Sequence, residues 1–372
     1  MVQEYKFPLL EKVVFGQGSL ARVPEEIDRL GKRRAFILTG KTLATKTDLV
    51  HRLEALLRDR WVGTYHGCQQ HVPSHTVDEA LGQARAAQAD MVISFGGGSP
   101  IDAAKIVALR LLGDRPQDAV PQIAVSTTLS AGEFTPAAGM TDEKTRVKGV
   151  HFDPRMVPKV VVLDPEVTVY TPTWLWASTG IKALDHAIEA LWSLNPQPVT
   201  DTLAIEAIRR LHRYLPLSMD GKNLEARGQC QIAAWMSIFG LMNVGVRLSH
   251  IFGHQIGARW DIPHGVTSCI ALPPVMRFLA PATAERQVLI AGALGISVEG
   301  RKSEEVAAEA AQTVESFIAS FSVPRRLRDV GAKEEELPAV AQAVLEEMSI
   351  WYRPEERGGG EETILGLLKE MW

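Results

Sequence analysis

The chain has 372 residues, of which 46% are apolar and 23% are charged, and its 40 basic and 44 acidic side chains leave a formal net charge of −4. This composition is that of a folded globular protein and excludes disordered, collagen-like and coiled-coil chains. The balanced charge argues against nucleic acid as a partner, because nucleic acid calls for a strongly basic face. No run of 18 apolar residues and no secretory signal pattern occurs, so we expect a cytoplasmic protein with no membrane partner.

Short apolar runs alternate with helical patterns from about residue 10 to residue 165. Four of these runs are apolar at both alternating positions: 35–39, 91–95, 122–126 and 160–163. This pattern is typical of strands buried on both faces of a parallel sheet. Residues 49–58 and 76–87 have the three- and four-residue apolar spacing of helices. The alternation predicts an α/β domain with a doubly wound, mostly parallel sheet.

After residue 165 the strand patterns nearly vanish. Helical patterns cover about 173–193, 199–215, 223–255, 273–294, 303–321, 335–349 and 361–371. We therefore predict an α/β domain over residues 1–165 and an all-α domain over residues 166–372. Residues 353–360 end in three consecutive glycines and are predicted to be a loop.

A glycine turn follows the apolar run 91–95. Its sequence is Gly96-Gly97-Gly98-Ser99-Pro100. Glycines let the backbone approach a pyrophosphate, and a helix start offers it unpaired N–H groups. We expect Ser99 to cap the helix and Asp102 to reach back to the cap. The spacing is not G-x-G-x-x-G, so a merely well-capped helix is the alternative at this point.

A second turn follows the run 35–39. An acidic residue at this place would usually hold the ribose 2′-hydroxyl of NAD. Here the chain has Gly40 and Lys41, which tolerate or favour a 2′-phosphate. We therefore expect NADP(H) at least as readily as NAD(H), with an ordinary surface turn as the alternative.

Histidines form a second candidate site. His250, His254 and His264 fall within 15 residues, and the first two share one helix face because they are four residues apart. His186 lies on a polar helix face that also carries Lys182. Taken singly, such histidines are more often hydrogen-bonded core or surface residues. Together they indicate a metal site or a proton relay.

These features resemble the iron-containing (group III) alcohol dehydrogenase family, and the likeness covers nearly the whole chain. It is carried by the segments 12–18, 96–105, 178–193, 249–273, 352–354 and 371–372. The segment 127–136 is one residue shorter than in typical alcohol dehydrogenases and is similar to the maleylacetate reductase branch. The resemblance implies a dinucleotide-binding N-terminal domain, a helical C-terminal domain and a catalytic cleft between them.

The resemblance also implies roles for single residues. The positions that match the pyrophosphate-binding residues are Gly97, Gly98 and Ser99. Asp102 would approach the nicotinamide side, and the cofactor groove would be lined by Thr127, Thr128 and Leu129. Three metal ligands are matched by His186, His250 and His264, and His254 matches the histidine that relays a proton beside the substrate.

One position departs from the family's metal site. The aspartate that normally lies four residues before the first histidine ligand is Lys182 here, and maleylacetate reductases, whose chemistry is regarded as metal-independent, lack that aspartate too. A charged ammonium about 4 Å from a divalent cation costs roughly 8 kcal/mol at an effective dielectric constant near 20. Deprotonating a lysine at pH 7 costs about 4–5 kcal/mol. A bound iron or zinc ion would therefore force Lys182 neutral or aside, and we expect no tightly bound metal.

We therefore predict an NAD(P)-dependent dehydrogenase or reductase. It would interconvert a small carbonyl compound (an aldehyde, ketone or oxo acid) and an alcohol, or reduce a maleylacetate-like substrate, with Lys182, His254 and His186 as catalytic residues. Two alternatives stay open: a lyase of the same architecture that resembles dehydroquinate synthase, and a catalytically inactive nucleotide-binding protein. We also expect the chain to form a homo-oligomer, namely a dimer.

Overall fold

A computed structural model of the chain describes residues 4–113, 119–143, 147–193, 195–239, 241–245, 247–352 and 359–372. The chain divides into two units, each described here by itself. The first unit contains Met1–Thr171 and Asp220–Trp235, and the second contains Pro172–Met219 and Met236–Trp372.

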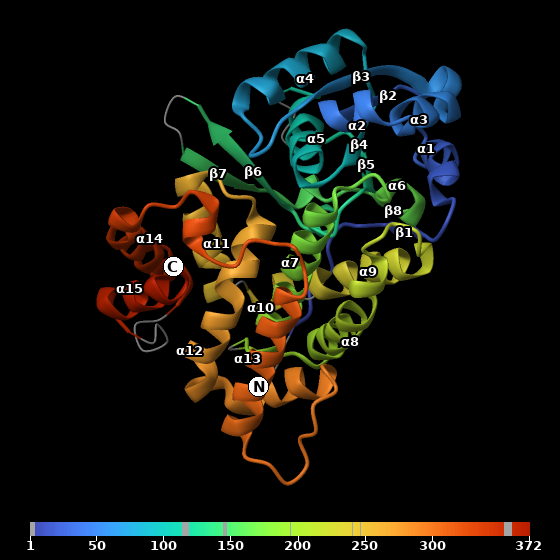
Figure 1. Cartoon of the computed structure of the whole chain (residues 1–372). Coiled ribbons are helices and arrows are strands. Elements are labelled where there is room, and N and C mark those ends of the chain that lie inside the picture. Colours follow the sequence, from blue (N-terminus) through green and yellow to red (C-terminus); the bar gives the residue numbers. More distant parts are fainter. Residues whose placement is uncertain are drawn as a thin grey trace. The chain divides into compact units, whose positions relative to one another are not determined.

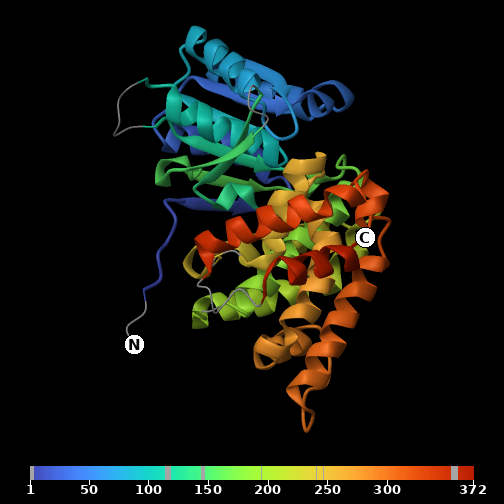
Figure 2. The ribbon, with the colours of Figure 1, turned by 90° about the vertical axis from the view of Figure 1, so that its left-hand side faces the viewer.

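A six-stranded parallel sheet forms the centre of the first unit (Figures 1 and 2). Its strand order is β1-β8-β5-β4-β2-β3. The strands are β1 (Lys12–Phe15), β2 (Ala35–Gly40), β3 (Trp61–Cys68), β4 (Met91–Gly96), β5 (Gln122–Ser126) and β8 (Val160–Leu163). A separate antiparallel hairpin consists of β6 (Ala137–Asp142) and β7 (Val147–Phe152). The predicted doubly wound, mostly parallel sheet is thus confirmed.

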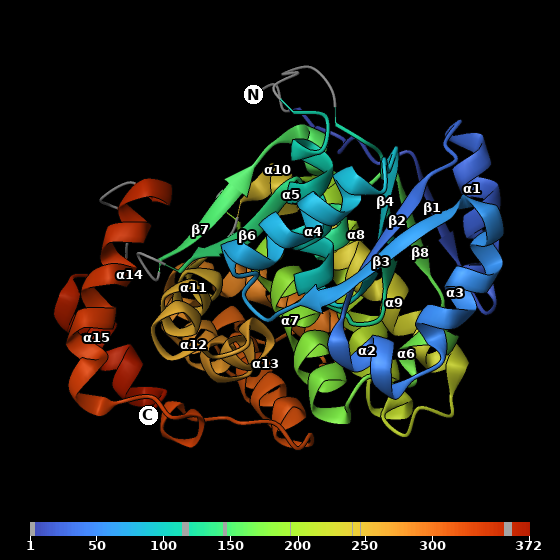
Figure 3. The same ribbon diagram turned by 90° about the horizontal axis from the view of Figure 1, so that it is seen from above.

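Helices cover both faces of this sheet. They are α1 (Val23–Arg29), α2 (Lys41–Lys46), α3 (Leu49–Leu57), α4 (Ser74–Ala86), α5 (Gly98–Arg110) and α6 (Pro165–Thr168). One buried cluster joins α1 and α3 to side chains such as Ile37 and Ile93, and another joins α4 and α5 to Phe36 and Val92. Figure 3 shows the two helix pairs on opposite sides of the strands. Alternate residues of a strand therefore pack into different hydrophobic clusters, one on each face of the sheet. This explains why successive residues of these strands are all apolar.

The four strands predicted from sequence are the central ones, β2, β4, β5 and β8. The edge strands β1 and β3 were not predicted. Their burial pattern is mixed, and Phe15 and Trp61 are exposed. An edge strand that is only half covered lacks the continuous apolar run that marks a buried one, so sequence pattern alone does not reveal it.

The order of the strands reverses between β2 and β4. From β2 the chain moves outward to β3 at one edge, and from β4 it moves the other way to β5. In open α/β sheets, ligands bind beyond the carboxyl ends of the strands at such a switch point. Here these two ends carry Gly40 and Gly96, which are the two turns singled out in the sequence.

The first unit differs from the predicted domain of residues 1–165, because it extends to Thr171 and includes Asp220–Trp235. Buried side chains account for the added segment. The guanidinium group of Arg227 donates a hydrogen bond to the carbonyl oxygen of Thr168 at 2.6 Å, and the ring of Trp235 stacks on Phe134 with centroids 5.8 Å apart. Helical periodicity identified this segment as helix but carries no information about its packing partner.

The second unit is helical in the residues that the structure describes. Its helices are α7 (Thr173–Leu191), α8 (Pro198–Tyr214), the end of α9 (Leu224–Phe239), α10 (Leu241–Val244), α11 (Leu248–Trp260), α12 (His264–Ala293), α13 (Ser303–Ala319), α14 (Leu337–Trp351) and α15 (Glu361–Glu370). In Figures 1 and 2, α14 and α15 are the red pair, which pack on each other. Residues 353–358, most of the predicted loop, lie outside the described residues.

Two helix boundaries differ from the predictions. The single helix predicted over 223–255 is wrong, because the chain forms α9, α10 and α11 there, and Gly245 adopts the left-handed backbone (φ 78°) between the last two. The helix predicted from residue 273 begins at His264 instead, with Pro273, Pro274 and Pro281 inside it. Packing of α12 against α7 and α13 outweighs the usual helix-ending effect of proline. By length and composition α12 could cross a membrane, but 67% of its most apolar window is buried in the protein, as in a core helix.

Candidate functional site

The glycine turn connects β4 to α5, the arrangement predicted from sequence, but its cap differs. Gly97 is the cap residue and Gly98 begins the helix. The predicted cap of Ser99 with Asp102 is therefore wrong, because Ser99 already lies inside the first helical turn. The carboxylate of Asp102 instead accepts a hydrogen bond from the backbone N–H of Gly139 on β6 at 3.1 Å.

The loop after β5 packs directly on this turn. The backbone N–H of Thr127 donates to the carbonyl oxygen of Gly96 at 2.9 Å. A Cβ at Gly97 would lie 2.9 Å from the Cγ2 atom of Thr128, and Gly96 has φ 149°. Both glycines are therefore required by the local geometry. Thr127 and Thr128 are buried, and Leu129 is completely buried, so the structure brings the residues assigned to the cofactor groove against the turn.

Lys105 was not singled out in the sequence, yet it holds this region together. Its fully buried ammonium group donates to three carbonyl oxygens, those of Gly132, Thr135 and Ala137, at 2.6–2.7 Å. Burial lowers the pKa of Lys105 to about 8, while Asp102 and Glu133 act against that shift. The lysine ties α5 to the loop that leads into β6.

Gly40 and Lys41 lie beside the glycine turn, because β2 and β4 are neighbours in the sheet. Lys41 is exposed. If Gly40 had a Cβ atom, the nearest atom to it would be the carbonyl oxygen of Cys68. The distance of 3.6 Å is an ordinary van der Waals contact. The position can therefore hold a larger side chain, and its glycine is not imposed by packing.

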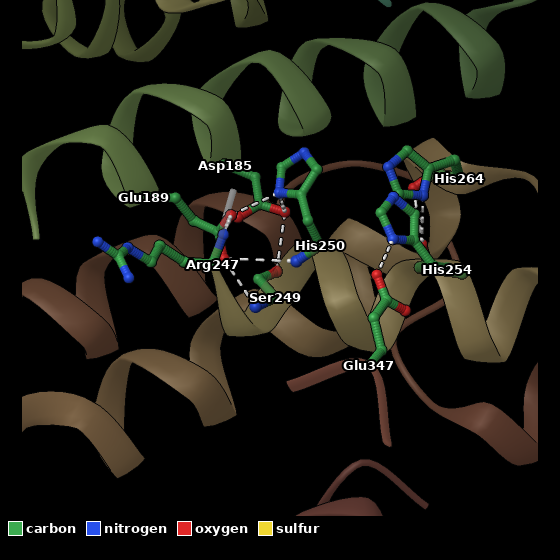
Figure 4. Close-up of polar contacts among 9 residues, drawn as sticks. Asp185, Glu189, Arg247, Ser249, His250, His254, His264 and Glu347 are labelled. Carbon is green, nitrogen blue, oxygen red and sulfur yellow. Dashed lines mark hydrogen bonds and ion pairs between the residues drawn. The ribbon is translucent and has the colours of Figure 1, made fainter. Parts of the chain in front are cut away.

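Four imidazole rings come together in the second unit, from three helices. His186 lies on α7, His250 and His254 on α11, and His264 on α12. Ring centroids are 4.8 Å apart for His186 and His250, 5.3 Å for His250 and His264, and 5.5 Å for His264 and His254. Figure 4 shows the rings of His250, His264 and His254 near one another. We call these four residues the histidine cluster.

Two glycines allow this close approach of the helices. A Cβ at Gly265 on α12 would lie 2.8 Å from the backbone of Ser178 on α7. A Cβ at Gly253 on α11 would lie 2.7 Å from the ring of His264. Real Cβ atoms do not approach neighbours so closely, so a side chain at either position would force the helices or the ring apart.

His250 has its ring orientation fixed by Glu189. The Nδ1 atom of His250 lies 2.6 Å from the Glu189 carboxylate, which also accepts hydrogen bonds from the backbone N–H groups of Arg247 and Ser249 (Figure 4). The ionised form of Glu189 only accepts, so with this form Nδ1 carries the proton and Nε2 has the lone pair. The Nε2 atom is buried and has no hydrogen-bond partner among the described residues.

Asp185 adds a second buried carboxyl group on the same side of the ring. It accepts a hydrogen bond from the Ser249 hydroxyl at 2.8 Å and lies 3.9 Å from the Nδ1 atom of His250. Burial raises the pKa values of Asp185 and Glu189 to about 7. Ligand atoms of Asp185, Glu189 and His250 lie within 4.8 Å of one another, a grouping that could hold a metal ion. Glu189 is bonded to His250 within this group, and Asp185 is held by Ser249 outside it.

The ring of His186 is buried, and its Nδ1 atom has no hydrogen-bond partner among the described residues. Burial holds the pKa of His186 well below its usual value, and repulsion from a proton on His250 and from the charge of Lys182 would lower it further. Burial likewise lowers the pKa of His250 to about 4, and Lys182 again contributes. The half-buried Lys182 therefore acts electrostatically on both rings, which are kept neutral.

The histidine cluster meets only part of what a divalent metal needs. Neutral imidazoles with unpartnered buried nitrogens, as in His186 and His250, are suitable ligands. The charge of Lys182 that disfavours a proton on these two rings also disfavours a dication bound to them. Asp185 does not replace the missing aspartate, because it lies toward Nδ1 of His250 and the lone pair is on Nε2. The donor set therefore does not fit a tightly bound divalent metal while Lys182 is charged.

His254 has a partner that the sequence analysis missed. Its Nδ1 atom lies 2.7 Å from a carboxylate oxygen of Glu347 on α14. The two residues are 93 positions apart, and nothing in the local pattern around either one indicates the contact.

Known families, proteins and structures match the chain over nearly its whole length. Residues 11–165 match the iron-containing alcohol dehydrogenase family, and residues 176–372 match the C-terminal part of the Fe-containing alcohol dehydrogenase family. The chain is 33% identical to lactaldehyde reductase of Escherichia coli over 98% of each chain, and 34% identical to maleylacetate reductase of Sphingobium indicum over 81% of this chain and 82% of that one. It is similar to the alcohol dehydrogenase structure from Oenococcus oeni, with a TM-score of 0.92, 26% identity and complete coverage of both chains.

The fold and these matches define the chain as an oxidoreductase of the NAD(P)-dependent dehydrogenase and reductase class. It belongs to the iron-containing alcohol dehydrogenase family, and its relatives include maleylacetate reductases. The resemblance inferred from the sequence is thereby confirmed for both halves of the chain.

Proposed function

We propose that the protein reduces the carbonyl group of a small aldehyde, ketone or oxo acid with NAD(P)H, or catalyses the reverse oxidation of the alcohol. A maleylacetate-like substrate belongs to the same proposal, because the relatives include enzymes of that name. The nicotinamide cofactor would bind with its pyrophosphate at Gly97, Gly98 and Ser99. The turn supports this role through its position at the strand-order reversal and through the free N–H groups of the α5 start.

The proposal is carried by the half-buried Lys182, which lies one helical turn before His186 on α7 and lowers the pKa values of His186 and His250. Hydride transfer from C4 of the nicotinamide to the carbonyl carbon leaves a negative charge on the oxygen. The Lys182 ammonium group would stabilise that alkoxide, and His254 would donate the proton that completes the alcohol. His186 and His250, both neutral, would line the site. No step requires a metal.

The test is a screen of NAD(P)H consumption over aldehydes, ketones, oxo acids and maleylacetate, with chelated enzyme and with added iron or zinc. We expect turnover of at least one compound by the chelated enzyme. Lys182→Met removes the charge and keeps the chain length, and it should lower kcat by about 10²–10³-fold. The matched control is Lys302→Met, because Lys302 is an exposed lysine of the same unit, directly before α13.

Three results would contradict the proposal. Turnover that appears only with added metal and is unaffected by Lys182→Met would assign the charge stabilisation to the metal. Binding of NADPH without turnover of any compound would favour an inactive nucleotide-binding protein. Product formation without net consumption of cofactor would favour a lyase. Elemental analysis of Lys182→Asp provides a separate check, since this variant should bind more iron or zinc than the native chain.

A further inference from the structure

His254 is the ring of the histidine cluster that is best placed to exchange protons with water. Its side chain is 38% exposed, whereas His186 and His250 are almost completely buried. It stacks on His264 with ring planes 14° apart, so it is part of the cluster while one edge of the ring stays open. A group that donates a proton in every turnover needs such access in order to be reprotonated.

Both carboxylate oxygens of Glu347 contact side chains of α11. One oxygen lies 2.7 Å from the Nδ1 atom of His254, and the other accepts a hydrogen bond from the side-chain amide of Gln255 at 2.6 Å. The carboxylate is only 15% exposed. Its orientation is therefore fixed by two neighbouring residues of one helix, as Figure 4 shows for His254.

The charge of Glu347 also reaches the rest of the cluster. Both Glu347 and His254 are among the groups that act electrostatically on His250, with opposite signs. The carboxylate is thus part of the electrostatic environment of the site and more than a tie between α11 and α14.

We propose that Glu347 is a positioning residue for His254. Its carboxylate keeps a proton on Nδ1 and directs Nε2, the atom that donates the proton, away from α14. The Nε2–H bond then breaks as the proton moves to the alkoxide oxygen. The hydride and its electron pair come from NAD(P)H, which becomes NAD(P)⁺, and water restores the proton on Nε2. This role rests on the proposed carbonyl reduction.

Glu347→Gln tests the role, because it removes the charge and nearly preserves the shape. We expect kcat to fall about 10–100-fold with little change in the KM for NAD(P)H, as expected when the partner that orients a histidine is lost. Glu346→Gln is the matched control, because Glu346 is the preceding, exposed carboxylate of α14, bonded to Gln342 of the same helix. Gln255→Ala removes the other contact of Glu347 and leaves its bond to His254, so it should lower kcat by less than Glu347→Gln does. Glu346→Gln should keep the native kcat.

A double-mutant cycle separates positioning from a structural effect. His254→Ala should lower kcat by about 10²-fold, and adding Glu347→Gln to it should have no further effect. Additive losses, or an equal loss in Gln255→Ala, would overturn the positioning role and leave Glu347 as a tie between two helices.

The ¹⁵N NMR spectrum of the histidine rings gives a readout that does not depend on activity. In the native protein the His254 signals should show a protonated Nδ1, and Glu347→Gln should change them while Glu346→Gln does not. Unchanged signals in Glu347→Gln would refute the inference even in an active enzyme. Changed signals in a protein that reduces no carbonyl compound would uphold the positioning and refute the proposed function instead.

Discussion

The glycine turn of the first unit consists mainly of backbone groups, whereas the histidine cluster of the second unit consists of side chains. At the turn, the proposed cofactor site consists of backbone groups, because Gly96, Gly97 and Gly98 carry no side chains. In the cluster, side chains from three helices form the site, and buried carboxyl groups such as Glu189 and Asp185 hold them. A backbone site tolerates changes beside it, whereas a buried polar network depends on every partner. The predictions that follow test this difference, beginning with the largest effect.

Gly265→Ala should destabilise the second unit by about 2–3 kcal/mol. The new methyl group would lie 2.8 Å from the Ser178 backbone, which cannot move aside as a flexible side chain would. Gly292→Ala is the matched control on the same helix, because nothing lies within 4 Å of its Cβ position, and it should stabilise by up to about 1 kcal/mol. Denaturant unfolding measures both. Equal effects of the two variants would show that the contact between α7 and α12 does not restrict the cluster.

Asp185→Asn should raise the free energy of unfolding at pH 8 by about 2 kcal/mol. Burial raises the pKa of Asp185 to about 7 in the folded protein, while in the unfolded chain the group ionises near pH 4. Between these values the folded state binds more protons, so the native protein loses stability as the pH rises from about 4 to about 7. The variant should lose less over that window, and near pH 4 the two should be alike.

Thermal or denaturant unfolding at several pH values measures this difference in slope. Asp329→Asn replaces an exposed aspartate of the same unit and should leave the slope as it is in the native protein. Parallel curves for the native protein and Asp185→Asn would mean that Asp185 stays ionised in the folded state.

Gly40→Asp should shift the cofactor preference toward NADH by about tenfold, or about 1.4 kcal/mol. The aspartate would repel a 2′-phosphate and accept a hydrogen bond from a ribose hydroxyl. The nearest atom to the new Cβ, the Cys68 carbonyl oxygen, lies at 3.6 Å, so folding should be unaffected. The ratio of kcat/KM for NADH and NADPH measures the effect. An unaltered ratio would place the ribose elsewhere.

The sequence predicts the first unit better than the second. The central strands and the glycine turn are visible because a buried parallel strand and a backbone ligand site each have a local pattern. The capping of α5 was predicted wrongly, because nothing local indicates that Asp102 contacts Gly139 in a hairpin 37 residues away. The spacing of the histidines also indicates that they act together. Contact among all four rings, however, depends on how three helices pack, which spacing does not show.

Partners of the cluster were the hardest part to predict. Glu189 could be noted on the same helix face as His186, but its bond to His250 spans 61 residues. Glu347 is one of two adjacent glutamates in α14, and only tertiary packing distinguishes it from Glu346. The break at Gly245 was missed for a similar reason, since a single glycine is tolerated within many helices.

The proposed use of the Lys182 ammonium group in place of a metal ion has one consequence for how the protein can be handled and where it can work. A dissociable ion can be stripped by a chelator, altered by oxygen or exchanged for a competitor from the medium. An ammonium group is covalently part of the polypeptide, so every folded chain contains one and a chelator does not remove it. It can instead be inactivated by reagents that modify amines, for example by acylation.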